Sequence, residues 1–215
     1  MARGLILLML AAAAFGAEVI DRVAVSLGHE VVTLGAIRRQ LRLNAYMQGK
    51  PPEDTPEARR AAAERLIDQA LVKREMSLSR YTPIPMAEVR QRFEEYREKL
   101  GLTPEKFAEE LKRYGFTAEE FLQEMYWQAT LLRFVQFRFS PSVQVGEDEI
   151  QEYYEKEYAP RLREMAPGQE PPPLAEVRER VTGILASRKE NAVLEQWLQQ
   201  SRQQARIRYH EEAFQ

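Results

Sequence analysis

The two ends of this 215-residue chain carry strand patterns, whereas almost everything between them has the spacing of helices. Residues 18–33 read EVIDRVAVSLGHEVVT, which is two short runs of alternating apolar residues around a Gly-His-Glu turn. Residues 205–209 read ARIRY, a third alternating run that directly follows a long helical stretch. The sequence therefore predicts a mainly α fold, in which an N-terminal hairpin and the C-terminal strand form a small β-sheet.

Capping residues and prolines divide the body of the chain into helical segments. Four threonines precede runs with helical spacing and are predicted N-caps, namely Thr33, Thr55, Thr103 and Thr117. Pro56 and Pro104 occupy first helical positions, and Glu120 completes a capping box with the last of these threonines. The predicted helices span about 33–48, 55–80, 86–100, 103–115, 117–139, 146–158 and 174–202. A proline-rich junction, Ala159–Pro173, separates the last two helices.

The first residues have the pattern of an export signal. Arg3 precedes an apolar stretch from Leu5 to Phe15, and Ala14 and Gly16 are small residues suited to cleavage before residue 17. The sequence predicts a signal peptide over residues 1–16; an uncleaved N-terminal anchor is the alternative. No later segment approaches the roughly 20 apolar residues that a membrane-spanning helix needs. We therefore expect an exported, periplasmic protein with no integral membrane span after the signal.

The helix expected over 117–139 is apolar on more than one face. Phe121, Met125, Ala129 and Leu132 form one stripe, and further aromatic residues such as Phe134 lie on other faces. A helix that is apolar all round is normally buried on all sides, so one interpretation is a central core helix. The alternative is that one stripe is left over to contact a client protein or a second subunit.

The residues that most enzyme classes require are missing from the sequence. The absence of cysteine excludes disulfides, thiol nucleophiles and thiolate metal sites. The two histidines, His29 and His210, lie in no metal-ligand spacing, and no phosphate-binding glycine loop or nucleophile-elbow motif occurs. Neighbouring acids such as Glu109 with Glu110, and Glu147 with Glu149, lie in charge-rich helical segments that predict solvated faces. The formal charge of -2 gives no reason to expect a nucleic-acid partner. We expect no catalytic residue, no metal and no cofactor.

Three segments resemble the SurA-type family of exported chaperones and foldases. Residues 19–37, VIDRVAVSLGHEVVTLGAI, are similar to that family's N-terminal hairpin and first helix. Within them, Glu30 to Thr33 match its Glu-Val-[Val/Ile]-Thr element. Residues 143–158 are similar to the segment that leaves the family's N-terminal helical domain, and residues 173–209 to its closing helix and strand. The resemblance implies one chaperone domain over residues 17–215, divided into 17–140, 141–173 and 174–215.

The chain departs from this family at the proline-rich junction. Family members commonly carry one or two parvulin-type prolyl isomerase domains at this place, and residues 159–173 are too few for such a domain. The resemblance therefore implies an ATP-independent holdase for unfolded or partly folded envelope and outer-membrane proteins, without isomerase activity. The alternative is a structural or assembly subunit of the envelope that uses the same surface for a permanent partner or dimer. A homodimer formed by exchange of the terminal strand is a further hypothesis.

The predicted contact surface for such clients consists of large apolar residues on the first, third, fourth and fifth helices. Aromatic rings and methionines supply most of the energy of adaptable apolar binding surfaces. The candidate residues are Tyr46, Met47, Phe93, Tyr96, Phe107, Phe116, Phe121, Met125 and Trp127. We expect an apolar cleft at this surface; for most of these residues taken singly, the alternative is a position in the core, which the usual burial preferences favour.

Overall fold

The computed structural model describes residues 21–215, and the predicted signal segment 1–16 lies outside this part of the chain. Within it, strands and helices follow one another in nearly the predicted order. The strands are β1 (Val23–Leu27), β2 (Glu30–Thr33) and β3 (Ile207–Tyr209). The helices are α1 (Leu34–Gln48), α2 (Pro56–Leu78), α3 (Met86–Lys99), α4 (Pro104–Arg113), α5 (Ala118–Phe139), α6 (Glu147–Tyr153), α7 (Ala159–Met165) and α8 (Leu174–Gln204).

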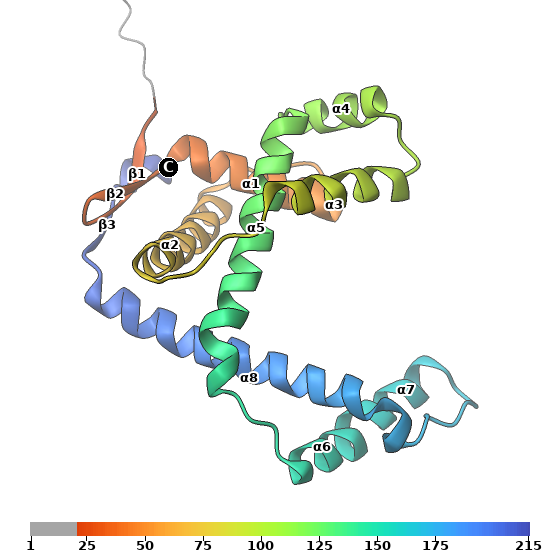
Figure 1. The fold of residues 1–215 in the computed structure, drawn as a ribbon. Helices are drawn as coiled ribbons and strands as arrows, with labels where there is room; N and C mark the ends of the chain where they lie inside the picture. Colours follow the sequence, from red (N-terminus) through yellow and green to blue (C-terminus); the bar gives the residue numbers. More distant parts are fainter. Residues whose placement is uncertain (1–20) are drawn as a thin grey trace, which may run out of the picture.

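Both ends of the described chain meet in one antiparallel sheet with the strand order β2-β1-β3 (Figure 1). β1 pairs with β2 through Leu27 and Glu30 across a two-residue turn, in which Gly28 has a φ of 60°. Glycine adopts this left-handed conformation without a Cβ clash. β3 pairs with the other side of β1, where Val25 lies opposite Tyr209. The predicted mainly α fold with a small sheet is confirmed, and the sheet closes within a single chain.

The predicted N-caps hold the starts of four helices. The side-chain oxygens of the four threonines accept hydrogen bonds from backbone N–H groups three residues later, at Ala36, Ala58, Lys106 and Glu120. Glu120 also accepts from the backbone N–H of Thr117 at 2.9 Å, which completes the predicted capping box. Among the helices of residues 21–215, none combines the length and the apolar character that crossing a membrane requires.

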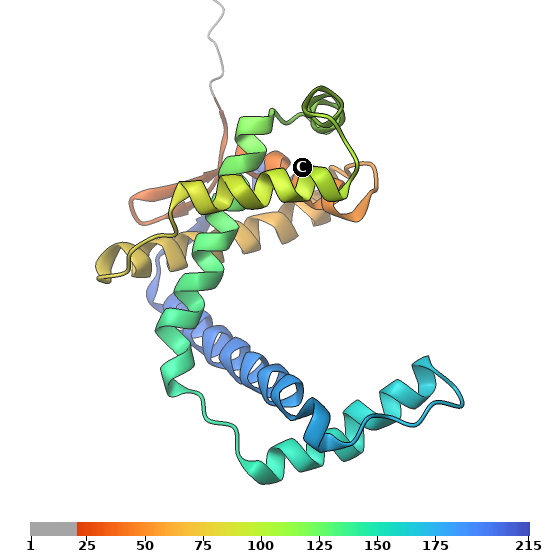
Figure 2. The ribbon, with the colours of Figure 1, turned by 45° about the vertical axis from the view of Figure 1, so that its right-hand side comes forward.

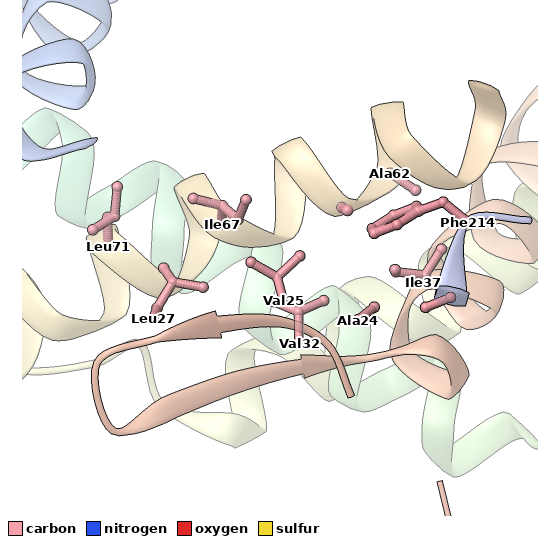
Figure 3. Packing of buried hydrophobic residues seen from close by; sticks show 11 residues of the cluster. Ala24, Val25, Leu27, Val32, Ile37, Ala62, Ile67, Leu71 and Phe214 are labelled. Carbon is pink, nitrogen blue, oxygen red and sulfur yellow. The ribbon is translucent and has the colours of Figure 1, made fainter. Parts of the chain in front are cut away.

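A first hydrophobic core lies between the sheet, α1 and α2 (Figure 3). Val25 and Leu27 of β1 point toward Ile67 and Leu71 of α2, and all four side chains are at most 9% exposed. Phe214, which follows β3, closes the other end of this core and is 4% exposed. The C-terminal segment therefore has two roles, because β3 completes the sheet and the residues after it fill one end of the core.

A second core joins α1, α3, α4 and α5. Phe107 of α4 is 1% exposed, and its ring centroid lies 5.5 Å from Phe93 and 6.0 Å from Phe121. These rings meet at 70° and 80°, in the edge-to-face arrangement that aromatic pairs favour. The pair α3 and α4 thereby packs on the N-terminal half of α5 (Figure 1).

α5 then connects two regions of different build, which we call the head and the arm. The head comprises residues 21–142 and 191–215, and the arm comprises residues 143–190, with α6, α7 and the N-terminal half of α8. Both views of the ribbon show the arm projecting away from the head (Figures 1 and 2). A small cluster around Ile150, Tyr153 and Val181 holds the arm together. Because α8 runs through both regions, it carries the chain from the end of the arm back to the sheet.

The helix of the arm is longer than the sequence predicted. It was expected to end at Tyr158, before Pro160, but it continues as α7 to Met165. A π-helical turn over Tyr154–Tyr158 precedes the proline. Proline removes one backbone donor, and its ring crowds the carbonyl of the residue four positions earlier, here Lys156. A widened turn relieves that crowding, so the helix passes the proline without ending.

Candidate functional site

The nine residues predicted to line an apolar cleft fall into three groups in the structure. Five of them are core residues with exposed fractions between 1% and 8%, namely Tyr46, Phe93, Phe107, Phe116 and Phe121. The expectation of an open cleft has to be corrected for these five, because their rings pack against one another and not against solvent. Packing of this kind stabilises the head, since each ring both buries apolar area and gains edge-to-face contacts.

Tyr46 illustrates how tightly this ring cluster is packed. Its ring centroid lies 5.3 Å from that of Tyr114 and 5.2 Å from that of Phe121. Burial, together with a hydrogen bond from the Tyr96 hydroxyl at 3.4 Å, raises the pKa of Tyr46 far above its ordinary value. The phenol therefore stays neutral and has no role as an acid or base near neutral pH.

A second group of predicted residues borders a shallow apolar groove of about 190 Å³ between α1, α3 and α5. We call it the α1–α5 groove, and it is lined by Leu43, Met47, Tyr96, Phe121, Glu124, Met125 and Gln128. Met47 is 60% exposed at its rim, Tyr96 and Met125 are half-buried, and Phe121 forms its floor at 3% exposure. The groove therefore brings together four predicted residues, of which three have atoms that a ligand can reach.

The apolar stripe of α5 continues from this groove toward the arm. Exposure rises along it, from 3% at Phe121 through the half-buried Met125 and Ala129 to 61% at Leu132. The apolar contacts of α3 and α4 with α5 extend to Ala129, and farther along the stripe Leu132 is largely exposed. The helix is thus a core helix on most faces, and it keeps one apolar stripe that reaches solvent.

The third group is Trp127 alone, which lies outside the α1–α5 groove. It lines a polar cavity of about 570 Å³ between α1, α2 and α5, and Lys73 Nζ lies 4.2 Å from its ring centroid. A cation at this distance from an indole face is attracted by the ring quadrupole. The buried indole Nε1 finds no acceptor among the described residues. Trp127 therefore connects α5 to α2 and does not extend the apolar surface.

Three residues of the groove, and one of the stripe that leads from it, were not among the predicted contacts. Leu132 belongs to a stripe that the sequence made visible, but helical spacing alone does not say which stripe a neighbouring helix covers. Leu43, Glu124 and Gln128 gave no signal, because they look like ordinary members of an amphipathic helix. Gln128 donates a hydrogen bond to Glu124 at 3.3 Å, and this polar pair forms one rim of the groove.

The described residues contain little that resembles a reactive site. Residues 21–215 hold no group of three or more His, Cys, Asp or Glu side chains arranged to bind a metal ion. His210 Nε2 lies 2.9 Å from Ser26 Oγ, but no described carboxylate bonds the other ring nitrogen to orient it, as a Ser-His nucleophile requires. Glu149, one of the neighbouring acids, is paired with Lys189, and that hydrogen bond lowers its pKa. The α1–α5 groove, lined mostly by apolar side chains, is therefore the candidate functional site, and what it can do is bind apolar groups.

No protein-family model matches this chain, and no curated protein matches it at a significant level. Any function has therefore to be inferred from the residues and the geometry described above.

Proposed function

We propose that this protein is an exported, ATP-independent chaperone that holds unfolded or partly folded envelope proteins, including outer-membrane proteins, through the α1–α5 groove and the stripe that leads from it. The observation that carries the proposal is the exposure of Met47 at the rim of a groove floored by Phe121, together with that of Leu132 on the stripe that leads from it. Large apolar side chains gathered at a concave surface are typical of binding sites. Such a surface would receive apolar side chains of many different clients.

The residues of this groove suit a binding surface with broad specificity. Met47 and Met125 are unbranched and polarisable, so their side chains adapt to partners of different shape. Tyr96 adds a rigid ring with a polar tip, which is the kind of residue that interfaces favour. The groove therefore offers adaptable contacts next to a fixed one, as a holdase for varied clients requires.

The size of the groove is consistent with binding that is reversible without an energy source. Burial of one large apolar side chain contributes roughly 2–3 kcal/mol before ordering costs are subtracted. A dissociation constant near 1 micromolar corresponds to about -8 kcal/mol, which three or four such contacts supply. The groove of about 190 Å³ is smaller than most ligand pockets, which hold roughly 300–1,000 Å³, so the exposed stripe has to supply part of these contacts. Clients would thus be released passively.

The resemblance to the SurA-type family and the signal pattern of residues 1–16 support the periplasm as the place of action. Prolyl isomerisation is not part of the proposal. Only residues 166–173 connect α7 to α8, and a parvulin-type domain cannot be built from so short a segment.

A light-scattering assay with an unrelated aggregating protein tests the proposal. We expect the wild-type protein to suppress aggregation at an equimolar ratio. The double variant Met47→Ser/Leu132→Ser should need about tenfold more protein for the same suppression. This factor corresponds to a loss of about 1.4 kcal/mol in binding free energy. The matched control is Met165→Ser/Leu100→Ser, which changes the same residue types at exposed positions outside the groove. The control variant should perform as the wild type does.

Two results would contradict the chaperone proposal. One is absence of suppression by the wild-type protein, and the other is an equal loss in the groove variant and in the control. The alternative, a structural or assembly subunit, predicts a stable dimer or a single tight partner. If sedimentation shows a wild-type dimer that dissociates in the Met47→Ser/Leu132→Ser variant, while aggregation is not suppressed, this alternative replaces the holdase.

A further inference from the structure

A second groove lies on the head, between the C-terminal half of α2, the C-terminal end of α8 and the turn of the hairpin. We call it the α2–α8 groove. It consists of two cavities of about 630 and 350 Å³ that share Leu71, Arg74, Gln204 and Ala205 and are therefore continuous. All three structural parts lie on the same side of the molecule in both ribbon views (Figures 1 and 2). None of its lining residues belongs to the α1–α5 groove.

Regular helical spacing builds the two long walls of this groove. The α2 wall is formed by Leu71, Arg74, Glu75 and Leu78, at spacings that place all four on one face of a helix. The α8 wall is formed by Trp197, Ser201 and Gln204, again on one face. The backbone of the hairpin turn and of the segment before β3 closes one end.

Ion pairs and hydrogen bonds tie α2 to α8 next to the groove. Arg202 donates to Glu64 at 2.5 Å and to Asp68 at 2.6 Å, and Tyr209 donates to Glu64 at 2.6 Å. Charge-assisted hydrogen bonds of this kind hold their partners in a defined geometry. Beyond these contacts α2 continues to Leu78, and the groove lies between this last part of α2 and the facing residues of α8.

The groove carries positive charge that the described chain does not neutralise. Arg74 and Arg206 both line it, and the guanidinium of neither forms a salt bridge or hydrogen bond within residues 21–215. Glu75 lines it too, but its carboxylate is paired with Arg138 at 3.1 Å. Glu30, on the hairpin turn, is the remaining carboxylate of the lining. Two free guanidinium groups against one free carboxylate favour an anionic partner.

Apolar side chains accompany these arginines along the same walls. Leu78 is 76% exposed, the half-buried Trp197 lies opposite on α8, and Leu71 forms the floor at 7% exposure. Their arrangement suits a partner that alternates acidic with apolar groups. A combined volume near the upper end of the usual range for ligand pockets, roughly 300–1,000 Å³, fits several residues of extended polypeptide.

We propose that the α2–α8 groove binds an extended acidic peptide segment, whose carboxylates pair with Arg74 and Arg206 and whose apolar side chains lie against Leu78 and Trp197. Guanidinium groups bind carboxylates with two parallel hydrogen bonds, which gives the interaction direction as well as strength. The site lies apart from the α1–α5 groove, so it goes beyond the proposed chaperone function and can fail or succeed independently of it.

The test measures binding of a dye-labelled peptide of about ten residues, in which glutamate alternates with leucine, by fluorescence anisotropy. A second peptide carries glutamine in place of every glutamate. We expect the glutamate peptide to bind the wild type at least about tenfold more tightly than the glutamine peptide does. The double variant Arg74→Gln/Arg206→Gln should lose this difference, because the carboxylates then have no cationic partner. Arg74 and Arg206 are both exposed, so the double variant should fold as the wild type does.

The matched control is Arg65→Gln, an exposed arginine of α2 outside every groove described above, and it should bind as the wild type does. In a Trp127→Phe background, Trp197 is the sole tryptophan, and its emission should shift when the glutamate peptide is added. Equal binding of the two peptides, or full binding by the double variant, would overturn the proposal. So would displacement of the peptide by an oligonucleotide of equal charge at lower concentration. Suppression of aggregation is measured separately, so a failure here leaves the chaperone proposal standing.

Discussion

The head buries whole side chains, with Ile67 and Phe134 at 0% exposure and Phe107 at 1%, whereas the hydrophobic cluster of the arm has three buried members. Those three are Ile150, Tyr153 and Val181. The head also joins segments from both ends of the described chain, and the arm joins only residues 143–190. Buried apolar area is the main favourable term in folding, so most of the stability of this protein lies in the head.

The arm has several ion pairs beside its small core, but they contribute little to its stability. Arg178 bonds Glu147 at 2.6 Å, and a similar pair joins Arg188 to Glu157 at 2.8 Å. The side chains of both pairs are 45% or more exposed, and exposed pairs are screened by solvent and salt. These pairs orient α8 against α6 and the π-helical turn that follows it, but they do not replace a core. We therefore expect the arm to open locally while the head remains folded.

The largest effect should come from the ring cluster of the head. Phe107→Ala removes a fully buried ring and leaves a cavity among Phe93, Tyr96 and Phe121. We expect a loss of about 3–5 kcal/mol in the free energy of unfolding, measured by urea titration. The control is Phe137→Ala, which removes a ring that is 55% exposed and should cost far less. Equal losses in the two variants would break the comparison between core and surface rings.

The core of the arm can be tested at Val181, which is fully buried. Val181→Ala should cost about 2 kcal/mol, because it removes two methyl groups from a cluster too small to repack. The cost should fall on the arm alone. Hydrogen exchange should therefore speed up at the amides of α6 and α7 and stay unchanged at Val25 in β1. If exchange at Val25 rises equally, head and arm unfold as one unit and the contrast drawn above is wrong.

A smaller effect on stability is expected at Glu64 of α2, which contacts α8 where that helix returns to the head. Burial by itself raises the pKa of this carboxyl, but hydrogen bonds from Tyr209 and Arg202 outweigh it and the net pKa is lowered. A lowered pKa in the folded state stabilises the protein above the unfolded pKa of about 4.3, and this stability disappears as the pH falls through the folded value.

Glu64→Gln should therefore cost about 1 kcal/mol at pH 7, a modest figure because the side chain is 38% exposed. The stability of the variant should also fall less steeply than that of the wild type below pH 5. Thermal unfolding between pH 3 and pH 7 checks both statements. Glu179→Gln serves as the control, at an exposed glutamate of α8 that forms no ion pair within residues 21–215. An unchanged acid dependence in Glu64→Gln would show that this contact does not tie α8 to the head.

The smallest effect is expected for the ion pairs of the arm. Arg178→Gln removes the bond to Glu147, and the midpoint of unfolding should remain within experimental error because both side chains face solvent. A clear drop in the midpoint, or a protection loss in α6 as large as that of Val181→Ala, would show that the pairs and not the core hold the arm.

Local signals in the sequence determined most of the secondary structure. The four threonine caps were predicted because each precedes a run with helical spacing, and all four accept the expected backbone hydrogen bonds. The hairpin and the final strand were predicted from alternating apolar residues and a glycine turn, and they pair in one sheet. The one helix end that was misplaced, at Pro160, depends on a π-helical turn that no local pattern announces.

The sequence by itself thus determined the helices, their caps and the strand character of both chain ends, because these depend on short-range spacing and on hydrogen bonds between near neighbours. That the two ends would pair was predicted from their matching strand patterns, but the pairing itself joins residues as distant as Val25 and Tyr209. Which large side chains stay in contact with water was decided only by tertiary packing. Helical spacing did not separate Phe93, Phe107 and Phe121 from Met47, yet the three rings bury one another where α3, α4 and α5 meet, whereas Met47 stays 60% exposed. Likewise, the free arginines of α2 and the segment before β3 come together only when α8 has returned to the sheet. Exposure is a property of the neighbours that a residue acquires on folding, and those neighbours lie far away in the chain.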